Sequence, residues 1–416
     1  MSRCRRRVLQ CIVALVAITG LPISPASPLK TAHAAVETYS GNQVIVTLAS
    51  GQTIATFNAD HGTTTLETLP DSATYVVALP STETTDEAVA QWATNPEVAS
   101  AEPNYRVDLL AAERFYLAFD RFYLGFDGGV PASASGQWAL RTIEAPTAQK
   151  ISLGQGITVA VLDTGVDPTH PALASHVAVG GYDYISGTDT ISDVAGGPAS
   201  GHGTFVAGLI AQVAPQATIL PFRVLDTNGL GTVGDVASAI ETATDDGARV
   251  INLSMGMAVS SRTLHAAISY AQSHGVVVVA SAGNQGSAIP QYPAAYDSVI
   301  AVAGTDQQDQ RASFSNYGDH IVVSAPAVDL YSAYPGGYAY GSGTSFAAPL
   351  VSGELALLDA VPGGMDSSRA SDLVKEGSIN IDALNPLYTG LLGAGRIDAL
   401  SAVLAACSIR RADGSP

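Results

Sequence analysis

Four long apolar runs constrain the fold of this chain more than any other feature of its sequence. They begin at residues 157, 218, 248 and 276 and read ITVAVLD, TILPFRVLD, ARVINLSMG and VVVVASAGN. Such runs are typical of β-strands buried on both faces, as in parallel sheets covered by helices. The stretches between them, TFVAGLIAQVA, DVASAIETAT and RTLHAAISYAQSH, have a helical pattern. The alternation predicts an α/β fold with a mostly parallel sheet flanked by helices, in which ligands bind beyond the carboxyl ends of the strands.

Length and charge narrow the class of protein. The 416 residues are 47% hydrophobic and include 41 glycines, which indicates a globular chain with many tight turns and room for more than one domain. The formal net charge is −18, and no run of Lys or Arg occurs outside the first residues. Nucleic acids and anionic membrane surfaces are therefore poor partners for it, and we expect neither.

The first 34 residues have the pattern of a secretory signal. A basic head, MSRCRRR, precedes an apolar stretch too short to span a bilayer, and AHA at 32–34 fits a small-residue cleavage site. We expect cleavage after Ala34, export, and no membrane association afterwards. RRRVLQ loosely resembles a twin-arginine signal, so the export route stays open, and a retained apolar anchor is the alternative. Removal of this segment leaves Cys407 as the single cysteine, which excludes a disulfide within the chain and a cysteine-based zinc site.

A small unit and an aromatic repeat precede the α/β region. NQVIVTLA, ATYVVAL and VASAEPNYRV read as strands and TDEAVAQWAT as a short helix, which predicts a compact α+β module. RFYLAFD at 114–120 is then repeated as RFYLGFD at 121–127. If this segment is helical, its four phenylalanines line one face and could dock on a domain until processing. The alternative is a duplicated linker without a role. The expected boundaries are 1–34 for the signal, 35–107 for the module, 108–136 for the linker, 137–407 for the α/β domain and 408–416 for a polar tail.

Four polar residues stand at strand ends or helix starts of the α/β region. Asp163 ends a strand, His202 lies between two glycines before a helix, Asn284 follows four valines, and Ser345 opens an apolar helix in GTSFAAP. Each has an ordinary structural alternative: a turn aspartate, a hydrogen-bonded loop histidine, a turn asparagine and a helix-capping serine. Together they supply a nucleophile, its base, an acid that orients the base and an amide for an oxyanion.

The order of these residues tests other classes of hydrolase. An aspartic protease needs two Asp-Thr-Gly or Asp-Ser-Gly motifs, and this chain has one, so only a homodimer could complete that site. An α/β-hydrolase has its histidine after its serine, whereas the last histidine here is His320, and no Gly-x-Ser-x-Gly motif occurs. The chymotrypsin order is formally possible but belongs to all-β barrels.

VAVLDTGVDPTHPAL, GHGTFVAG, SAGNQG and GTSFAAPLVSG closely resemble the motifs of the subtilisin-like serine peptidases, in that family's order over residues 137–405. The resemblance implies a serine endopeptidase in which Asp163 orients His202, His202 acts as general base and acid, and Ser345 attacks the peptide carbonyl. Asn284 would complete the oxyanion hole. Residues 42–107 resemble the family's inhibitory pro-domain, which implies an intramolecular inhibitor removed by self-cleavage between 108 and 136.

The resemblance extends to substrate binding. It implies protein and peptide substrates held as extended strands between two segments of this chain. These are Gly229, Leu230 and Gly231 in the first segment and Ser254, Met255 and Gly256 in the second. Gln291 is a weaker candidate for the base of the main specificity pocket. We expect a monomer and no cofactor.

The chain departs from the family's pattern in three places. Phe205 replaces a frequent second histidine, Ala172 replaces the aspartate of HPDL, and the loop that often binds calcium is short. The last two changes argue against the family's tight calcium site, although acidic side chains could bind calcium weakly. The rival hypothesis is a catalytically silent member of the same fold that acts as a binding module.

Overall fold

The computed structural model describes residues 38–70, 73–109, 123–124, 137–362 and 365–413. The predicted signal and most of the aromatic repeat lie outside these residues. We call residues 38–109 the N-terminal module and residues 137–413 the main domain. Within the described residues, none of the helices has the length and apolar character needed to cross a membrane.

The N-terminal module is an antiparallel sheet with two helices, as its sequence pattern predicts. The strand order is β2-β3-β1-β4, and β9 of the main domain follows β4 as a fifth strand. The bounds are β1 Tyr39–Leu48, α1 Ile54–His61, β2 Thr64–Thr68, β3 Thr74–Ala78, α2 Thr85–Trp92 and β4 Val98–Asp108. Helix α1 and strand β2 were not predicted.

The two faces of this sheet have different partners. Val44 and Val46 of β1 pack in the module's own core with Phe57 and Trp92, whereas Ile45 between them packs with residues of the main domain. Successive side chains of a strand point to opposite faces, so one face of the sheet supports the module and the other contacts the main domain.

The main domain contains a seven-stranded sheet of order β13-β12-β11-β10-β6-β8-β7. Every pairing within it is parallel. The bounds are β6 Thr158–Asp163, β7 Tyr182–Asp183, β8 Thr218–Arg223, β10 Val250–Leu253, β11 Val277–Ser281, β12 Ile300–Thr305 and β13 Val323–Pro326. The expected parallel sheet is therefore confirmed, and all four apolar runs lie in its strands.

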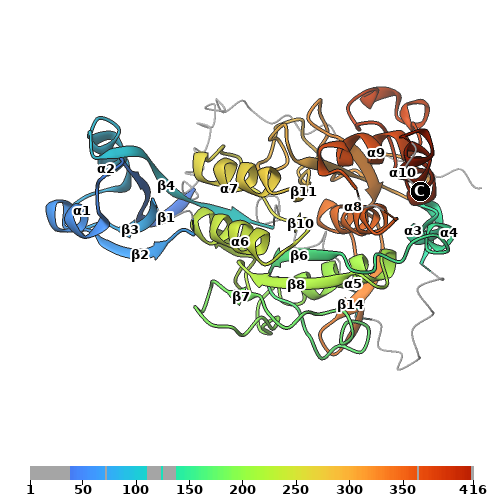
Figure 1. The fold of residues 1–416 in the computed structure, drawn as a ribbon, viewed down its shortest axis with the longest axis horizontal. Coiled ribbons are helices and arrows are strands. Elements are labelled where there is room, and N and C mark those ends of the chain that lie inside the picture. Colours follow the sequence, from blue (N-terminus) through green and yellow to red (C-terminus); the bar gives the residue numbers. More distant parts are fainter. Residues whose placement is uncertain (1–37, 71–72, 110–122, 125–136, 363–364, 414–416) are drawn as a thin grey trace, which may run out of the picture. The chain divides into compact units, whose positions relative to one another are not determined.

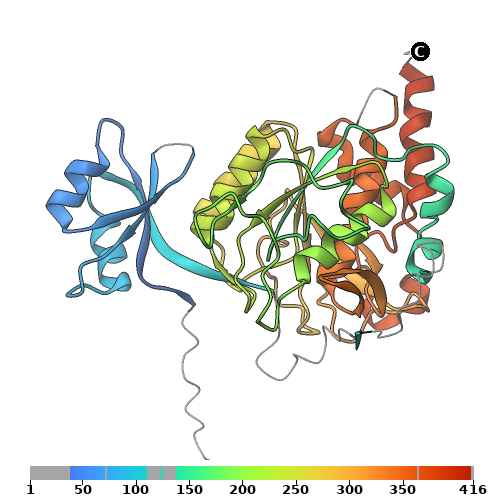
Figure 2. The same ribbon diagram turned by 90° about the horizontal axis from the view of Figure 1, so that it is seen from below.

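Both faces of this sheet are covered by helices. Along β6, Val159 and Val161 pack in one core, and Ala160 and Leu162 pack in a second core on the opposite face. Figures 1 and 2 show α6 and α7 together on one side of the sheet, with α5 and α8 on the other. The bounds are α5 His202–Val213, α6 Val233–Asp245, α7 Arg262–Ser273 and α8 Thr344–Asp359. Burial on both faces explains why the strands read as continuous apolar runs.

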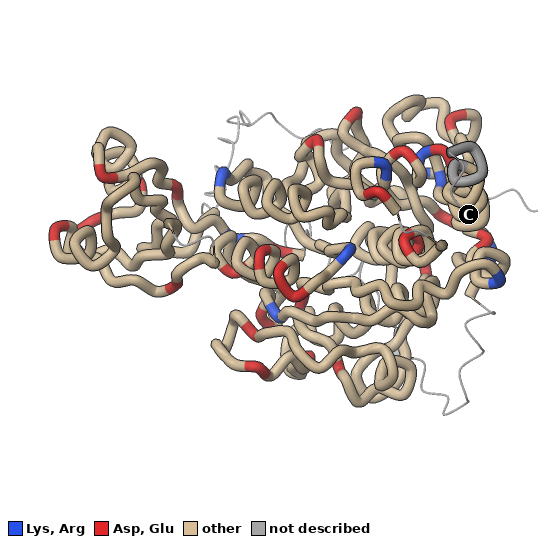
Figure 3. The backbone as a smooth tube through the Cα atoms, viewed as in Figure 1, with Lys and Arg blue, Asp and Glu red and all other residues tan. Residues whose placement is uncertain are grey.

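Shorter elements complete the main domain. Before the sheet come α3 Trp138–Thr142 and α4 Ala145–Ala148, and β9 Leu230–Thr232 precedes α6. The hairpin of β14 Leu330–Tyr334 and β15 Gly337–Gly341 precedes α8. After α8 come η2 Ser367–Arg369, α9 Ala370–Gly377, η3 Asp382–Leu384, η4 Pro386–Tyr388 and α10 Ala399–Asp413. Figure 3 shows acidic residues along both the N-terminal module and the main domain.

Two segments differ from the expectations. Helix α10 continues through Asp413, so it extends into the segment from residue 408 that the sequence predicts as a polar tail. Residues 409–413 read IRRAD, which a helix tolerates, and the first strong helix breaker is Gly414. In the aromatic repeat, Tyr123–Leu124 form a short strand, β5, whose backbone pairs with β15 rather than forming a helix. The rest of the repeat lies outside the described residues.

Candidate active site

The predicted triad residues lie at the ends of three elements of the main domain. Asp163 is the last residue of β6, His202 is the first residue of α5, and Ser345 is the second residue of α8. The side chains of all three are fully buried. Parallel strands present their carboxyl ends at one edge of a sheet, and helix starts follow there, so the topology brings these elements together.

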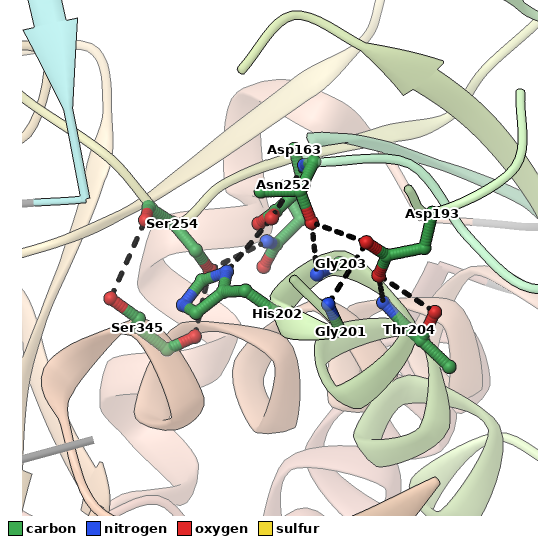
Figure 4. Close-up of polar contacts among 10 residues, drawn as sticks. Asp163, Asp193, Gly201, His202, Gly203, Thr204, Asn252, Ser254 and Ser345 are labelled. Atoms are coloured by element: carbon green, nitrogen blue, oxygen red, sulfur yellow. Dashed lines mark hydrogen bonds and ion pairs between the residues drawn. The ribbon is translucent and has the colours of Figure 1, made fainter. Parts of the chain in front are cut away.

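Asp163 and His202 form a direct hydrogen bond. His202 Nδ1 donates to Asp163 Oδ1 at 2.8 Å, and the backbone N–H of Thr164 donates to the same oxygen at 2.7 Å. An ionised carboxylate only accepts, so the imidazole proton on this side is on Nδ1 and Nε2 is the nitrogen that can act as a base. In the view of Figure 4 the imidazole lies between Asp163 and Ser345. Its ring also packs on Phe346, the residue after Ser345, with ring centroids 5.2 Å apart.

Two glycines allow the imidazole to reach this position. Gly201 has a φ of +88°, and a Cβ there would lie 2.2 Å from the ring of Tyr334. A Cβ on Gly203 would lie 2.2 Å from the carbonyl oxygen of Gly165. The start of α5 therefore packs against the backbone after β6 more closely than any residue with a side chain permits.

The backbone of Ser345 is held by a neighbouring serine. Ser345 is followed at the fourth position by Pro349, which has no N–H to donate to the Ser345 carbonyl. Ser254 Oγ donates to that carbonyl instead, at 2.7 Å, and the Ser345 hydroxyl donates to the Ser254 carbonyl at 3.4 Å. Asn252 Nδ2 in turn donates to Ser254 Oγ at 2.9 Å, and Ser352 Oγ donates to Asn252 Oδ1 at 2.9 Å.

The amide of Asn284 is oriented by the residue before the serine. Its Oδ1 accepts hydrogen bonds from the N–H of Thr344 at 2.8 Å and from the Thr344 hydroxyl at 2.9 Å. These bonds turn the acceptor end of the amide toward Thr344 and the Nδ2 donor end away from it. Ser345 itself lies in the first turn of α8, whose amides have no carbonyl partner within the helix. Both groups have the chemistry of an oxyanion-binding pair.

The two predicted substrate-binding segments lie on either side of strand β4 of the N-terminal module. β9 pairs antiparallel with β4, with Asp108 opposite Leu230 and Val107 opposite Gly231. On the other side Asp108 exchanges two backbone hydrogen bonds with Gly256, at 3.0 and 2.8 Å. Leu109, the next residue, is buried, and a Cβ on Gly229 would lie 2.7 Å from its side chain.

The other residues singled out in the sequence analysis are buried or pack against the core. Gln291 is buried beside Gly283. Phe205, which stands where the family often has a histidine, is fully buried and packs on Phe346 with centroids 4.4 Å apart. Cys407 of α10 packs against the core, and Ala172 does the same. Among the described residues, no group of three or more His, Cys, Asp or Glu is arranged to hold a metal ion.

Sequence reasoning missed several polar residues around the site. Asp193 contacts the start of α5, and Asn252 supports Ser254 (Figure 4). Glu102 of the N-terminal module accepts three hydrogen bonds from the start of α7. None of them belongs to a motif, and no signal in the sequence separates them from other polar residues.

Comparison with known protein families identifies the class of protein to which this fold and site belong. The subtilase family profile matches residues 154–378, and a profile described as the fervidolysin N-terminal prodomain matches residues 25–104. The chain belongs to the subtilase family and is a serine protease with a fervidolysin-type pro-domain.

Particular relatives agree with this assignment. Thermitase of Thermoactinomyces vulgaris is 45% identical over 239 residues, which are 55% of this chain and 84% of that protein. Subtilisin Savinase of Lederbergia lenta is 38% identical over 268 residues, 62% of this chain and 96% of that protein. The crystal structure of fervidolysin from Fervidobacterium pennivorans, described as a keratinolytic enzyme related to subtilisin, is similar with a TM-score of 0.73 and 27% identity. That match covers 88% of this chain and 61% of the fervidolysin chain.

Proposed function

We propose that this chain is an exported serine endopeptidase, made as a self-inhibited precursor, that cleaves peptide bonds through Asp163, His202 and Ser345. The observation that carries the proposal is the buried 2.8 Å hydrogen bond from His202 Nδ1 to Asp163 Oδ1, with Ser345 in the first turn of α8. Serine is a weak nucleophile until a base takes its proton, and the carboxylate holds the imidazole in the tautomer that can do so.

In the first half of the reaction Ser345 Oγ attacks the peptide carbonyl carbon while His202 Nε2 takes the hydroxyl proton. The carbonyl oxygen becomes an oxyanion, which accepts hydrogen bonds from Asn284 Nδ2 and the N–H of Ser345. Because Thr344 already fixes the Asn284 amide, these donors need little reorganisation as the charge develops. Asp163 stays ionised and stabilises the imidazolium.

In the second half the imidazolium gives its proton to the leaving amine, the C–N bond breaks, and an acyl-enzyme ester remains on Ser345. Water then attacks the ester with His202 as base. The new acid product leaves, and Ser345 regains its proton from His202.

Substrate binding and self-inhibition follow from the same two segments. An extended peptide between β9 and residues 254–256 would be bound largely through its main chain, which favours broad specificity. The proposal that the N-terminal module inhibits is supported by the pairing of β4 with both segments. Cleavage within 108–136 would then release the mature enzyme, after removal of the signal at 1–34. We expect it to act as a monomer on protein and peptide substrates.

The test is covalent labelling of Ser345 with a serine-directed phosphonate or sulfonyl fluoride. We expect the wild-type protein to be labelled, Ser345→Ala to resist the reagent, and His202→Ala to react much more slowly. Ser345→Ala expressed alone should also remain as the uncut precursor. Normal maturation of Ser345→Ala would mean that another protease makes the cut.

The binding-module hypothesis predicts the opposite result. A folded, processed wild-type protein that resists the reagent and cleaves no casein would favour a silent subtilase fold. Circular dichroism of each sample provides the control for folding, because a loss of labelling is informative only in a folded protein.

A further inference from the structure

Asp193 is a carboxylate next to the proposed triad that the mechanism above does not use. It lies nine residues before His202 in the loop between β7 and α5. Its side chain is partly buried and points at the start of α5 in Figure 4. Charged groups in such positions are costly to bury without hydrogen bonds, so its partners indicate its role.

Asp193 caps the helix that begins at the histidine. Its Oδ1 accepts the N–H of Gly201 at 2.9 Å, and its Oδ2 accepts the N–H of Thr204 at 3.2 Å. The residue at the N-cap of α5 is Gly201, which has no side chain to cap the helix itself. Asp193 therefore supplies from a distance the acceptor that serine, threonine or aspartate usually provides at this position.

The same carboxylate is tied to the strand end that carries Asp163. The hydroxyl of Thr164 accepts the N–H of Gly203 at 3.0 Å and donates to Asp193 Oδ1 at 3.3 Å. Thr164 directly follows Asp163, and Gly203 directly follows His202. Asp193 thus connects the residues next to both partners of the 2.8 Å hydrogen bond.

These contacts require a group that accepts at both oxygens. The Thr204 hydroxyl accepts the N–H of Asp167 at 3.0 Å, so its proton is directed to Asp193 Oδ2 at 2.9 Å. Asparagine has the same shape but would place an NH₂ donor against other donors on one side. Replacement of the carboxylate therefore breaks contacts that no rotation of an amide restores.

Asp193 also adds a negative charge beside the dyad. Burial raises the pKa of Asp193 to about 6, partly offset by the hydrogen bonds from Gly201 and Thr204, and the charge of Asp163 raises it further. Asp193 in turn raises the pKa of Tyr334, after the larger effect of that residue's own burial.

We propose that Asp193 is a positioning residue that holds the end of β6 and the first turn of α5 in the register that places His202 Nδ1 on Asp163. This inference rests on the proposed triad. It assigns Asp193 no contact with substrate, so its effect must appear in the chemical step rather than in peptide binding.

The experiment compares Asp193→Asn with the wild-type full chain. We measure conversion of the refolded precursor, then kcat and KM on a peptide substrate after conversion, each per folded molecule. We expect precursor conversion and kcat to fall roughly 10- to 100-fold, the range that small misplacements of catalytic groups produce. KM should change less than about twofold, because Asp193 forms its hydrogen bonds with residues 164, 201 and 204 rather than with the segments proposed to bind substrate.

Asp359→Asn is the matched control. Asp359 also accepts a backbone N–H, from Met365 at 2.7 Å, and pairs with Arg249, but it lies 14 residues along α8 from Ser345, about 21 Å by helix geometry. Asp359→Asn should lose stability without losing kcat per folded molecule. If Asp193→Asn behaves in the same way, or keeps a kcat within about twofold of wild type, the positioning role is wrong.

A double-mutant cycle with Thr204→Val provides a second test. If both residues act through the cap, the two losses of kcat do not multiply, and Asp193→Asn/Thr204→Val resembles Asp193→Asn alone. Multiplying losses would contradict the shared role. Ser345→Ala in the same series separates the two claims. An active Ser345→Ala contradicts the triad itself, whereas an inert Ser345→Ala beside an unimpaired Asp193→Asn contradicts only the role of Asp193.

Discussion

Ser254 supplies the hydrogen bond to the Ser345 carbonyl that Pro349 cannot donate within α8, and this replacement can be tested quantitatively. Ser254→Ala would take away the donor to the Ser345 carbonyl at 2.7 Å and the acceptor for Asn252 Nδ2 at 2.9 Å. Ser254, Ser345 and Asn252 are all fully buried. The substitution leaves the Ser254 backbone intact, so the segment proposed to bind substrate keeps its main-chain groups.

The magnitude follows from the two polar groups that lose partners. A buried donor or acceptor left without a hydrogen bond costs about 1–3 kcal/mol. We expect Ser254→Ala to lower the free energy of unfolding by about 2–4 kcal/mol, because water entering the space of the lost hydroxyl reduces part of each penalty. A shift of the Ser345 backbone should also lower kcat.

Pro349→Ala should restore one of the two lost partners. The new alanine would have an N–H at the fourth position after Ser345, where an α-helix forms its regular bond to the carbonyl. The Asn252 amide would remain without its acceptor. We therefore expect the cost of Ser254→Ala to be about half as large when measured in the Pro349→Ala background as in the original chain.

The assay is urea unfolding of four proteins that all carry Ser345→Ala. This change prevents autolysis but keeps the backbone carbonyl that accepts the hydrogen bond. The comparison uses the midpoint of unfolding at unchanged slope, since a change in slope would indicate a change in the unfolded or native state rather than in stability alone. Equal costs of Ser254→Ala in both backgrounds would refute the argument that Ser254 replaces the missing N–H.

Two further predictions concern the contact between the N-terminal module and the main domain. Glu102 accepts three hydrogen bonds from the start of α7, at 2.7, 3.0 and 2.8 Å. After precursor cleavage, Glu102→Ala should therefore weaken the complex between the cleaved N-terminal module and the main domain by about 2–4 kcal/mol, or roughly 30- to 1000-fold. It should also shorten the lag between precursor cleavage and the appearance of peptidase activity. Glu87→Gln, in the exposed capping box of α2, is the control that should leave the lag unchanged. Burial, and then the charge of Glu67 in the N-terminal module, raises the pKa of Asp235 to about 7. The complex of module and main domain should therefore weaken as pH rises through about 7, where Asp235 ionises beside Glu67. The lag should therefore shorten as pH rises. If the lag of Asp235→Asn depends on pH as strongly as that of the wild-type chain, this role of Asp235 is wrong.

The sequence predicted those features whose physical cause lies within a short stretch of chain. Val250 and Ile251 of β10 are both buried, in cores on opposite faces, and this double burial produces the continuous apolar run that indicates a covered parallel strand. The short helix predicted from TDEAVAQWAT is present as α2, and the structure shows that a local capping box of Thr84 and Glu87 begins it.

Features that depend on distant contacts could not be predicted in this way. Asp189 and Asp193 lie in the same polar loop, but Asp189 is exposed and Asp193 caps α5. Their difference depends on how the loop passes over the helix start, and no local pattern encodes it. The helical end of α10 is a different case, because polar composition alone does not distinguish a tail from a helix end, and the residues before Gly414 are compatible with a helix.

The register of β4 explains how the proposed inhibition can be compatible with broad specificity. Asp108 uses both its N–H and its carbonyl on Gly256, while β4 also pairs with β9 on the other side. These are main-chain groups that an extended substrate would need under the proposed function, so module and substrate would compete for the same donors and acceptors whatever the substrate's side chains. Main-chain pairing of a few residues does not by itself distinguish inhibitor from substrate. A preference for the module would therefore come from contacts beyond β9 and residues 254–256, such as those of Glu102 with the start of α7.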